Sequence, residues 1–137
     1  MECHTKDVQG PIPIDTAKLF QGNRQFPAVE FGLPVPPFPA VIYSRNLTPH
    51  ANGIQGWTAV AVANALKLGV DKDGIPLCPP MPAGPGMAFG GLTDSDALDI
   101  GYYLTTLPPQ DNGVIPNCSP PPRPDGGSDA STDARTD

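Results

Sequence analysis

Two stretches of the chain combine apolar residues at helical spacing with polar residues suited to helix ends. In the first, "GWTAVAVANALKLGV" (residues 56–70), Val62 and Leu66 lie four positions apart. Thr58 is suited to cap the N-terminus, and Gly69 is suited to the left-handed position after the last turn. We therefore predict a helix that begins after Thr58 and ends at Gly69.

The second stretch, "LTDSDALDIGYYLTTLPP" (residues 92–109), has Thr93 as the expected N-cap and Pro108 as the stop. Acidic residues in the first turn complement the positive end of the helix dipole. Gly101 would allow a second backbone to approach closely. The apolar stripe of this helix comprises Ala97, Ile100, Leu104 and Leu107.

The remainder of the chain is predicted to be mostly irregular. Twenty prolines and fifteen glycines interrupt it, and each proline removes a backbone donor and fixes φ. We predict a short helical turn at 16–21, an extended loop with short β pieces at 23–39, a strand at 40–44 and a long loop at 71–91. Residues 119–137 contain no large apolar side chain, which predicts a disordered tail.

Composition narrows the class of protein. The 137 residues suffice for one small domain, and the formal net charge of −6 disfavours binding to nucleic acid or polybasic docking to a membrane. No run of eighteen apolar residues is present, and residues 1–20 do not show the pattern of an export signal. A loop-rich domain of this size usually needs a disulfide, a metal or a cofactor in addition to its core.

The chain has three cysteines, Cys3, Cys78 and Cys118, and their spacing matches no zinc pattern. An odd number suggests that two form a disulfide and that the third has another role. Cys3 is followed directly by His4, which is the second half of C-x-x-C-H, the attachment sequence of c-type haem. The first cysteine of that motif would lie one position before Met1.

Four features in order carry a resemblance to a known family: "CHT" at 3–5, "NLTPHANGIQGW" at 46–57, "CPPMP" at 78–82 and the capped aromatic helix at 93–107. Together, over roughly residues 1–108, they resemble a bacterial class I cytochrome c. Members serve as small periplasmic electron carriers or as haem subunits of membrane-bound dehydrogenases.

The resemblance implies an all-α, loop-rich fold of few short helices that lacks the usual N-terminal helix. It implies a haem domain over 1–118 followed by the tail at 119–137, with one haem c per chain. The expected function is transfer of single electrons between redox proteins such as a dehydrogenase or an oxidase, through weak transient docking and without enzymatic activity of its own. The expected location is periplasmic or otherwise extracytoplasmic.

The resemblance also implies the residues that hold the haem. Cys3 would form a thioether and His4 would be the proximal ligand, because imidazole is a strong axial donor to haem iron. Met81, between prolines that stiffen its loop, would be the sixth ligand through its soft thioether sulfur. Met87 is the alternative sixth ligand and His50 a third option, although an exposed turn is the better interpretation of His50.

Three further residues could contact a haem propionate: Trp57, Arg45 and Asn46. Core packing is an alternative role for Trp57, and solvent exposure is an alternative for Arg45. A disulfide between Cys78 and Cys118 would tie the end of the chain to the base of the Met81 loop and would require an oxidising compartment. Two unpaired thiols are the alternative.

The chain departs from the family in lacking the first attachment cysteine and the N-terminal helix that crosses the last helix. We expect the natural chain to continue upstream with a cysteine, a helix and an export signal. A single-thioether cytochrome and a decayed fragment without haem are the alternatives.

Two other functions stay open at this point. One is a small haem peroxidase, which would bind carbon monoxide rapidly at an open sixth position. The other is a proline-rich extracellular binding module stapled by Cys78 and Cys118, which would show no haem spectrum.

Overall fold

The computed structural model describes residues 2–6, 15–113, 115, 116 and 118. In chain order, its elements are η1 (Glu2–His4), η2 (Thr16–Lys18), β1 (Gln25–Pro27), η3 (Ala28–Phe31), β2 (Val41–Tyr43), α1 (Ala59–Leu68), η4 (Ala88–Gly91) and α2 (Asp94–Thr106), where η denotes a 3₁₀ helix. No helix in these described ranges is long and apolar enough to cross a bilayer. The predicted tail at 119–137 lies outside them, so the division into a domain and a tail stays a prediction.

Both α-helices begin and end where their sequences predict. The Thr58 hydroxyl accepts a hydrogen bond from the Ala61 N–H at 3.0 Å, and the Thr93 hydroxyl accepts one from the Asp96 N–H at 3.0 Å. Gly69 ends α1 in the left-handed conformation, with φ of 70°. These caps satisfy backbone donors that a helix start would otherwise leave unpaired.

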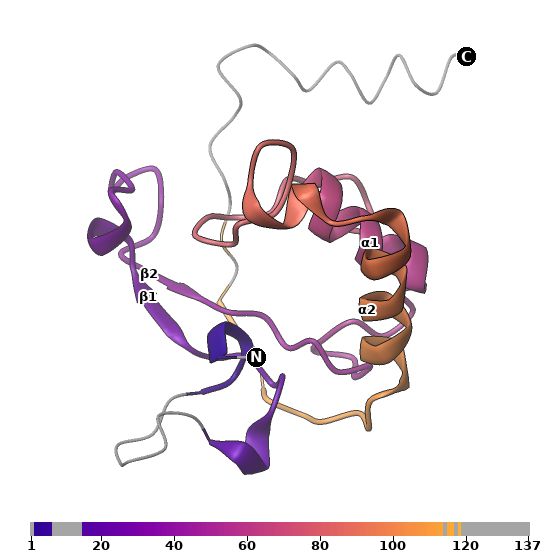
Figure 1. Ribbon diagram of the computed structural model, residues 1–137. Coiled ribbons are helices and arrows are strands. Elements are labelled where there is room, and N and C mark those ends of the chain that lie inside the picture. The colour runs from indigo at the N-terminus through magenta and orange to yellow at the C-terminus, as the bar shows by residue number, and fades with distance from the viewer. Residues whose placement is uncertain (1, 7–14, 114, 117, 119–137) are drawn as a thin grey trace.

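The two helices pack directly against each other on one side of the molecule (Figure 1). Gly101 of α2 is buried, and a Cβ there would lie 2.9 Å from Ala59 Cα at the start of α1. The predicted close approach of a second backbone at Gly101 is therefore confirmed, and the backbone is that of α1. The core beside this crossing consists of Ile54, Val62 and Leu104, with Phe20, Leu47, Trp57 and Leu107 packed around it.

The prediction of an all-α fold is wrong, because the structure contains a two-stranded antiparallel sheet. β1 pairs with β2 in the register Gln25 with Tyr43, Phe26 with Ile42 and Pro27 with Val41. The proline-rich sequence cannot sustain a helix here, so the chain extends, reverses at η3 and Gly32, and pairs with itself. The expected strand at 40–44 is confirmed as β2, and the expected helical turn at 16–21 is the shorter η2.

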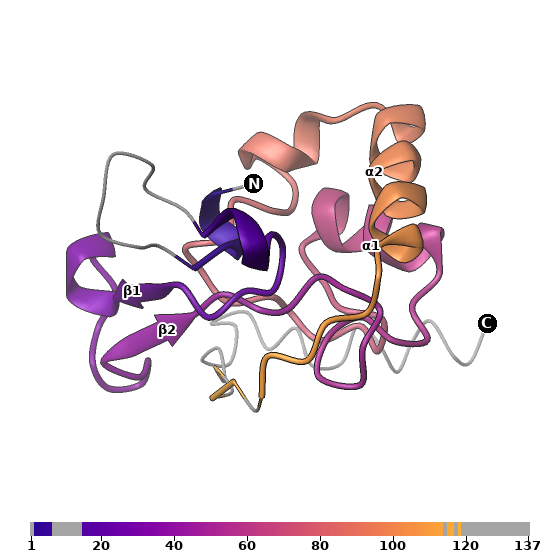
Figure 2. The same ribbon diagram turned by 90° about the horizontal axis from the view of Figure 1, so that it is seen from below.

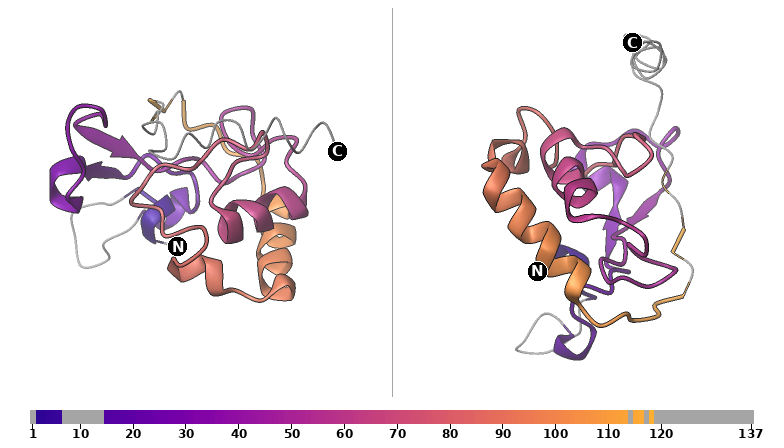
Figure 3. Two further views of the ribbon diagram at one scale, coloured as in Figure 1. Left: turned by 90° about the horizontal axis from the view of Figure 1, so that it is seen from above. Right: turned by 90° about the vertical axis from the view of Figure 1, so that its right-hand side faces the viewer.

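Most of the chain outside these elements is loop, as predicted, and the loops are fastened to the helices. The loop at 69–92 folds back on the end of α1, where Gly84 N–H donates to the Leu66 carbonyl at 3.0 Å. In Figure 1, a ring is formed by η1, the loop at 44–58, α1, α2 and the loop at 69–92. Within this ring, η1 and the loop at 69–92 lie on opposite sides. Figures 2 and 3 show the β1–β2 hairpin at the end of the molecule away from α1 and α2.

Candidate functional site

The imidazole of His4 is held in one orientation by a hydrogen bond from Nδ1 to the Arg45 carbonyl oxygen, at 2.8 Å. A carbonyl can only accept, so the Nδ1 proton is fixed by this contact and the neutral ring keeps its lone pair on Nε2. No described residue forms a hydrogen bond with Nε2. Metal-ligating histidines are commonly oriented in this way, with the other ring nitrogen bonded to a backbone carbonyl.

The environment of His4 also favours its neutral form. The side chain is partly buried, and burial lowers its pKa because the charged ring loses hydration. The hydrogen bond to the Arg45 carbonyl acts in the opposite direction, and the net pKa is still lowered. The lone pair on Nε2 is therefore available over a wider pH range than in a free histidine.

His50 has the opposite arrangement. Its Nδ1 accepts a hydrogen bond from the Asn52 N–H at 3.2 Å, which places the proton of the neutral ring on Nε2. Main-chain hydrogen bonds from Gly53 N–H to the His50 carbonyl and from His50 N–H to the Thr48 carbonyl make it part of a tight turn. These contacts give His50 a structural role in the turn, and the ligand role of His4 stays a prediction.

Cys3 and the two methionines differ in their exposure. Cys3 is exposed and free, and it directly precedes His4 in η1. Met81 is partly buried in the loop at 69–92, which a hydrogen bond from Phe89 N–H to the Pro82 carbonyl closes at 2.9 Å. Met87 is 51% exposed at the start of η4. Met81 is thus the more enclosed of the two methionines. The loop at 69–92 that carries both lies on the side of the ring opposite η1 (Figure 1).

The three residues predicted to contact a propionate have different surroundings. Trp57 packs against the core, and its indole N–H forms no hydrogen bond with a described residue. Asn46 is 1% exposed, and its amide donates to the Gln110 carbonyl at 2.8 Å. Arg45 is exposed and donates from Nη1 to the carbonyls of Ile115 and Pro116, at 3.2 and 3.4 Å. Their contact with a propionate stays a prediction.

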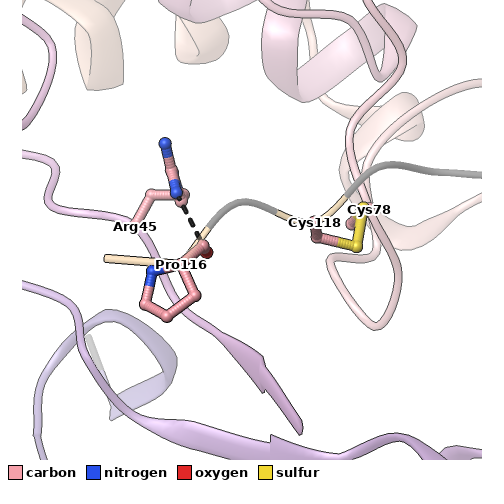
Figure 4. Close-up of a disulfide and its surroundings, with 4 residues drawn as sticks. All are labelled: Arg45, Cys78, Pro116 and Cys118. Atoms are coloured by element: carbon pink, nitrogen blue, oxygen red, sulfur yellow. Dashed lines mark hydrogen bonds between the residues drawn. A yellow bond between two sulfur atoms is a disulfide. The ribbon is translucent and has the colours of Figure 1, made fainter. Parts of the chain in front are cut away.

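The disulfide between Cys78 and Cys118 is present, which confirms that prediction. Figure 4 shows Arg45 directed at Pro116, and beyond it on the same segment Cys118 joined to Cys78. Sequence reasoning did not find this connection between Arg45 and the end of the chain. The only sequence feature that points to it is the presence of Cys118 just after Ile115 and Pro116.

The donor atoms fit part of a c-type haem site: Cys3 supplies one of the two thiols of the attachment motif, His4 supplies an imidazole with an available lone pair, and Met81 supplies a thioether in a tied loop. Two hollows, of about 180 and 210 Å³, lie near the loop at 44–53, and neither His4 nor Met81 lines them. The fit of a haem to this chain therefore rests on the donor atoms of Cys3, His4 and Met81 and not on either hollow. Among the described residues, no three His, Cys, Asp or Glu side chains gather as a metal-binding group.

Comparison with known proteins gives a partial similarity to a cytochrome subunit. No protein-family model matches the chain. Over 72 residues it is 38% identical to the fructose dehydrogenase cytochrome subunit of Gluconobacter japonicus, and the matched part is 51% of this chain and 14% of that protein. The chain therefore spans a small fraction of this relative. The similarity supports a cytochrome c-like relationship.

Proposed function

We propose that this chain is a c-type cytochrome domain that accepts and releases single electrons. The observation that carries the proposal is the His4 ring, held by the Arg45 carbonyl so that Nε2 keeps its lone pair, directly beside the free thiol of Cys3. Partial identity to a cytochrome subunit supports it. Bound haem supplies the one-electron chemistry, since its iron alternates between two oxidation states.

The residues of the chain bind and orient the group. Cys3 Sγ would hold the haem covalently, since addition of its S–H across a vinyl substituent would form a thioether without an oxidant. His4 Nε2 and the Met81 sulfur, with the Met87 sulfur as the alternative, would bind the haem iron. Trp57, which packs against the core, would donate its indole N–H to a propionate.

The partner is a redox protein of the dehydrogenase class, bound weakly and transiently as redox encounters usually are. The relative is named as a cytochrome subunit of a dehydrogenase, which supports this choice. The disulfide Cys78–Cys118 supports an oxidising, extracytoplasmic location. We propose no enzymatic activity for the chain itself.

Paired substitutions test the ligands. The chain is produced together with a c-type haem-attachment system, and its visible and pyridine haemochrome spectra are recorded. His4→Ala should abolish the native spectrum while His50→Ala preserves it, and Met81→Ala should change the oxidised spectrum while Met87→Ala does not. A folded, disulfide-bonded protein without any haem band would contradict the proposal and favour the binding module.

The sixth position is tested separately with carbon monoxide. A protein with Met81 bound to the reduced iron should react slowly, because the sulfur must leave first. Rapid binding by the unmodified protein, equal to that of Met81→Ala, would favour the small peroxidase.

A further inference from the structure

The segment that follows α2 is tied to the loop that orients His4. The amide of Asn46 donates to the Gln110 carbonyl at 2.8 Å, Gln110 N–H donates to the Thr48 hydroxyl at 3.0 Å, and the Asn52 amide donates to Asp111 at 2.8 Å. The two bonds to Gln110 are partly buried and the one to Asp111 is exposed, and together they hold the two segments in one register. Gln110 and Asp111 therefore lie along the loop at 46–52.

Arg45 continues this set of contacts toward the disulfide. Its backbone carbonyl accepts from His4 Nδ1 at 2.8 Å, and its Nη1 donates to the Ile115 and Pro116 carbonyls at 3.2 and 3.4 Å. Pro116 lies two positions before Cys118, which is bonded to Cys78. Cys78 in turn lies three positions before Met81.

We propose that Arg45 is a positioning residue that joins the two ligand segments: its carbonyl orients His4, and its guanidinium fixes the segment that anchors the Met81 loop through Cys78–Cys118. This inference rests on the proposed function for its ligand roles. The physical reason is that a loop holds a weak thioether ligand only as well as the loop itself is fixed to the rest of the fold. The charged Arg45 guanidinium donates to the carbonyls of Ile115 and Pro116 and so fixes the segment before Cys118, to which the disulfide joins the Met81 loop.

The test uses Arg45→Met, which removes the donors but keeps the backbone carbonyl and a side chain of similar length. The first readout does not need haem: it is the rate at which dithiothreitol reduces Cys78–Cys118 in the folded protein. Without the guanidinium, the segment before Cys118 opens more often, so the rate should rise about tenfold. Arg45→Lys keeps a charged donor, so the reduction rate should rise less than in Arg45→Met. Lys18→Met removes an exposed charge elsewhere and should leave the rate unchanged.

The second readout is the affinity of the oxidised holoprotein for added imidazole, which competes with Met81 for the sixth position. A looser Met81 loop is displaced more easily, so Arg45→Met should raise this affinity about tenfold. In a Cys78→Ser/Cys118→Ser background, the same substitution should change it by less than about twofold, because the connection is already broken. If the serine variant does not fold, the comparison is made on holoprotein whose disulfide has been reduced after haem attachment.

The outcomes separate this inference from the proposed function. An equal effect of Arg45→Met on imidazole affinity with and without the disulfide, or no effect at all, would overturn the positioning role. Unchanged reduction of the disulfide would overturn the tie itself. Absence of haem from every variant would defeat the proposed function and with it the ligand role, while the reduction rates would still decide whether Arg45 holds the segment.

Discussion

Of two adjacent glycines in η4, Gly90 and Gly91, only Gly90 should lose stability when it is replaced by alanine. A methyl group at Gly90 would overlap the Gly84 carbonyl oxygen and lie 2.7 Å from the Gly84 carbonyl carbon, whereas at Gly91 nothing lies within 4 Å. Neither glycine has a positive φ, so alanine introduces no backbone strain at either position. Gly90→Ala therefore tests the packing of the loop that carries Met81, and Gly91→Ala is its matched control.

The cost of Gly90→Ala follows from what must move. The Gly84 carbonyl carbon has to shift by about 0.7 Å to reach an ordinary contact of 3.4 Å. That shift disturbs the hydrogen bond from Met87 N–H to the Gly84 oxygen, at 3.1 Å, and the one from Gly84 N–H to Leu66, at 3.0 Å. Overpacking costs about 1–3 kcal/mol and a lost hydrogen bond about 1 kcal/mol, so we expect the free energy of unfolding to fall by roughly 3 kcal/mol.

Thermal unfolding followed by circular dichroism measures the effect. At about 4 °C per kcal/mol for a domain of this size, Gly90→Ala should melt roughly 10 °C below the parent protein, and Gly91→Ala within about 2 °C of it. Urea unfolding should give the same order with unchanged slopes. If both variants melt together near the parent, the loop at 69–92 does not pack as described.

Three other perturbations have defined outcomes. Gly101→Ala should lower the free energy of unfolding by about 2 kcal/mol in urea, because crowding against Ala59 at 2.9 Å outweighs the roughly 1 kcal/mol gain in helix propensity; no loss would contradict the crossing. Cys78→Ser/Cys118→Ser should lower the free energy of unfolding by about 4 kcal/mol, because the disulfide closes a loop of 40 residues. A decrease under about 1 kcal/mol would mean that the bond does not constrain the unfolded chain. The hydrogen bond and charge of Lys67 hold the pKa of Asp94 below its ordinary value of 3.8. The Lys67–Asp94 pair therefore stabilises the folded protein above that pH, and this stabilisation is lost as the pH falls through the lowered pKa. The difference in urea stability between the parent and Asp94→Asn should therefore be constant near neutral pH and shrink below about pH 4, and a difference independent of pH would contradict the pairing.

The sequence predicts those parts of the fold that depend on local chemistry. Thr58, Thr93 and Gly69 mark the ends of α1 and α2 because capping is decided within a few residues. The disulfide could be predicted from the cysteine count once Cys3 had been set aside with His4. These features need no knowledge of distant segments.

The parts that sequence reasoning missed depend on contacts between distant residues. β1 is three residues long and ends in proline, so it has no alternation that would reveal its pairing with β2. The role of the Arg45 side chain depends on a segment 70 residues away, and its carbonyl reaches His4 across 41 residues. The tautomer of His4 follows from this distant contact, whereas that of His50 follows from the local hydrogen bond from Asn52 N–H.

Attachment of haem at Cys3 is the central claim, and peptide mass spectrometry tests it most directly. The chain is produced with a c-type haem-attachment system, digested without reduction and analysed for haem-bearing peptides. The account predicts one haem per chain, on the peptide that contains Cys3 and His4, and none in Cys3→Ser. Folded protein with Cys78 and Cys118 linked and an unmodified Cys3 peptide would contradict it.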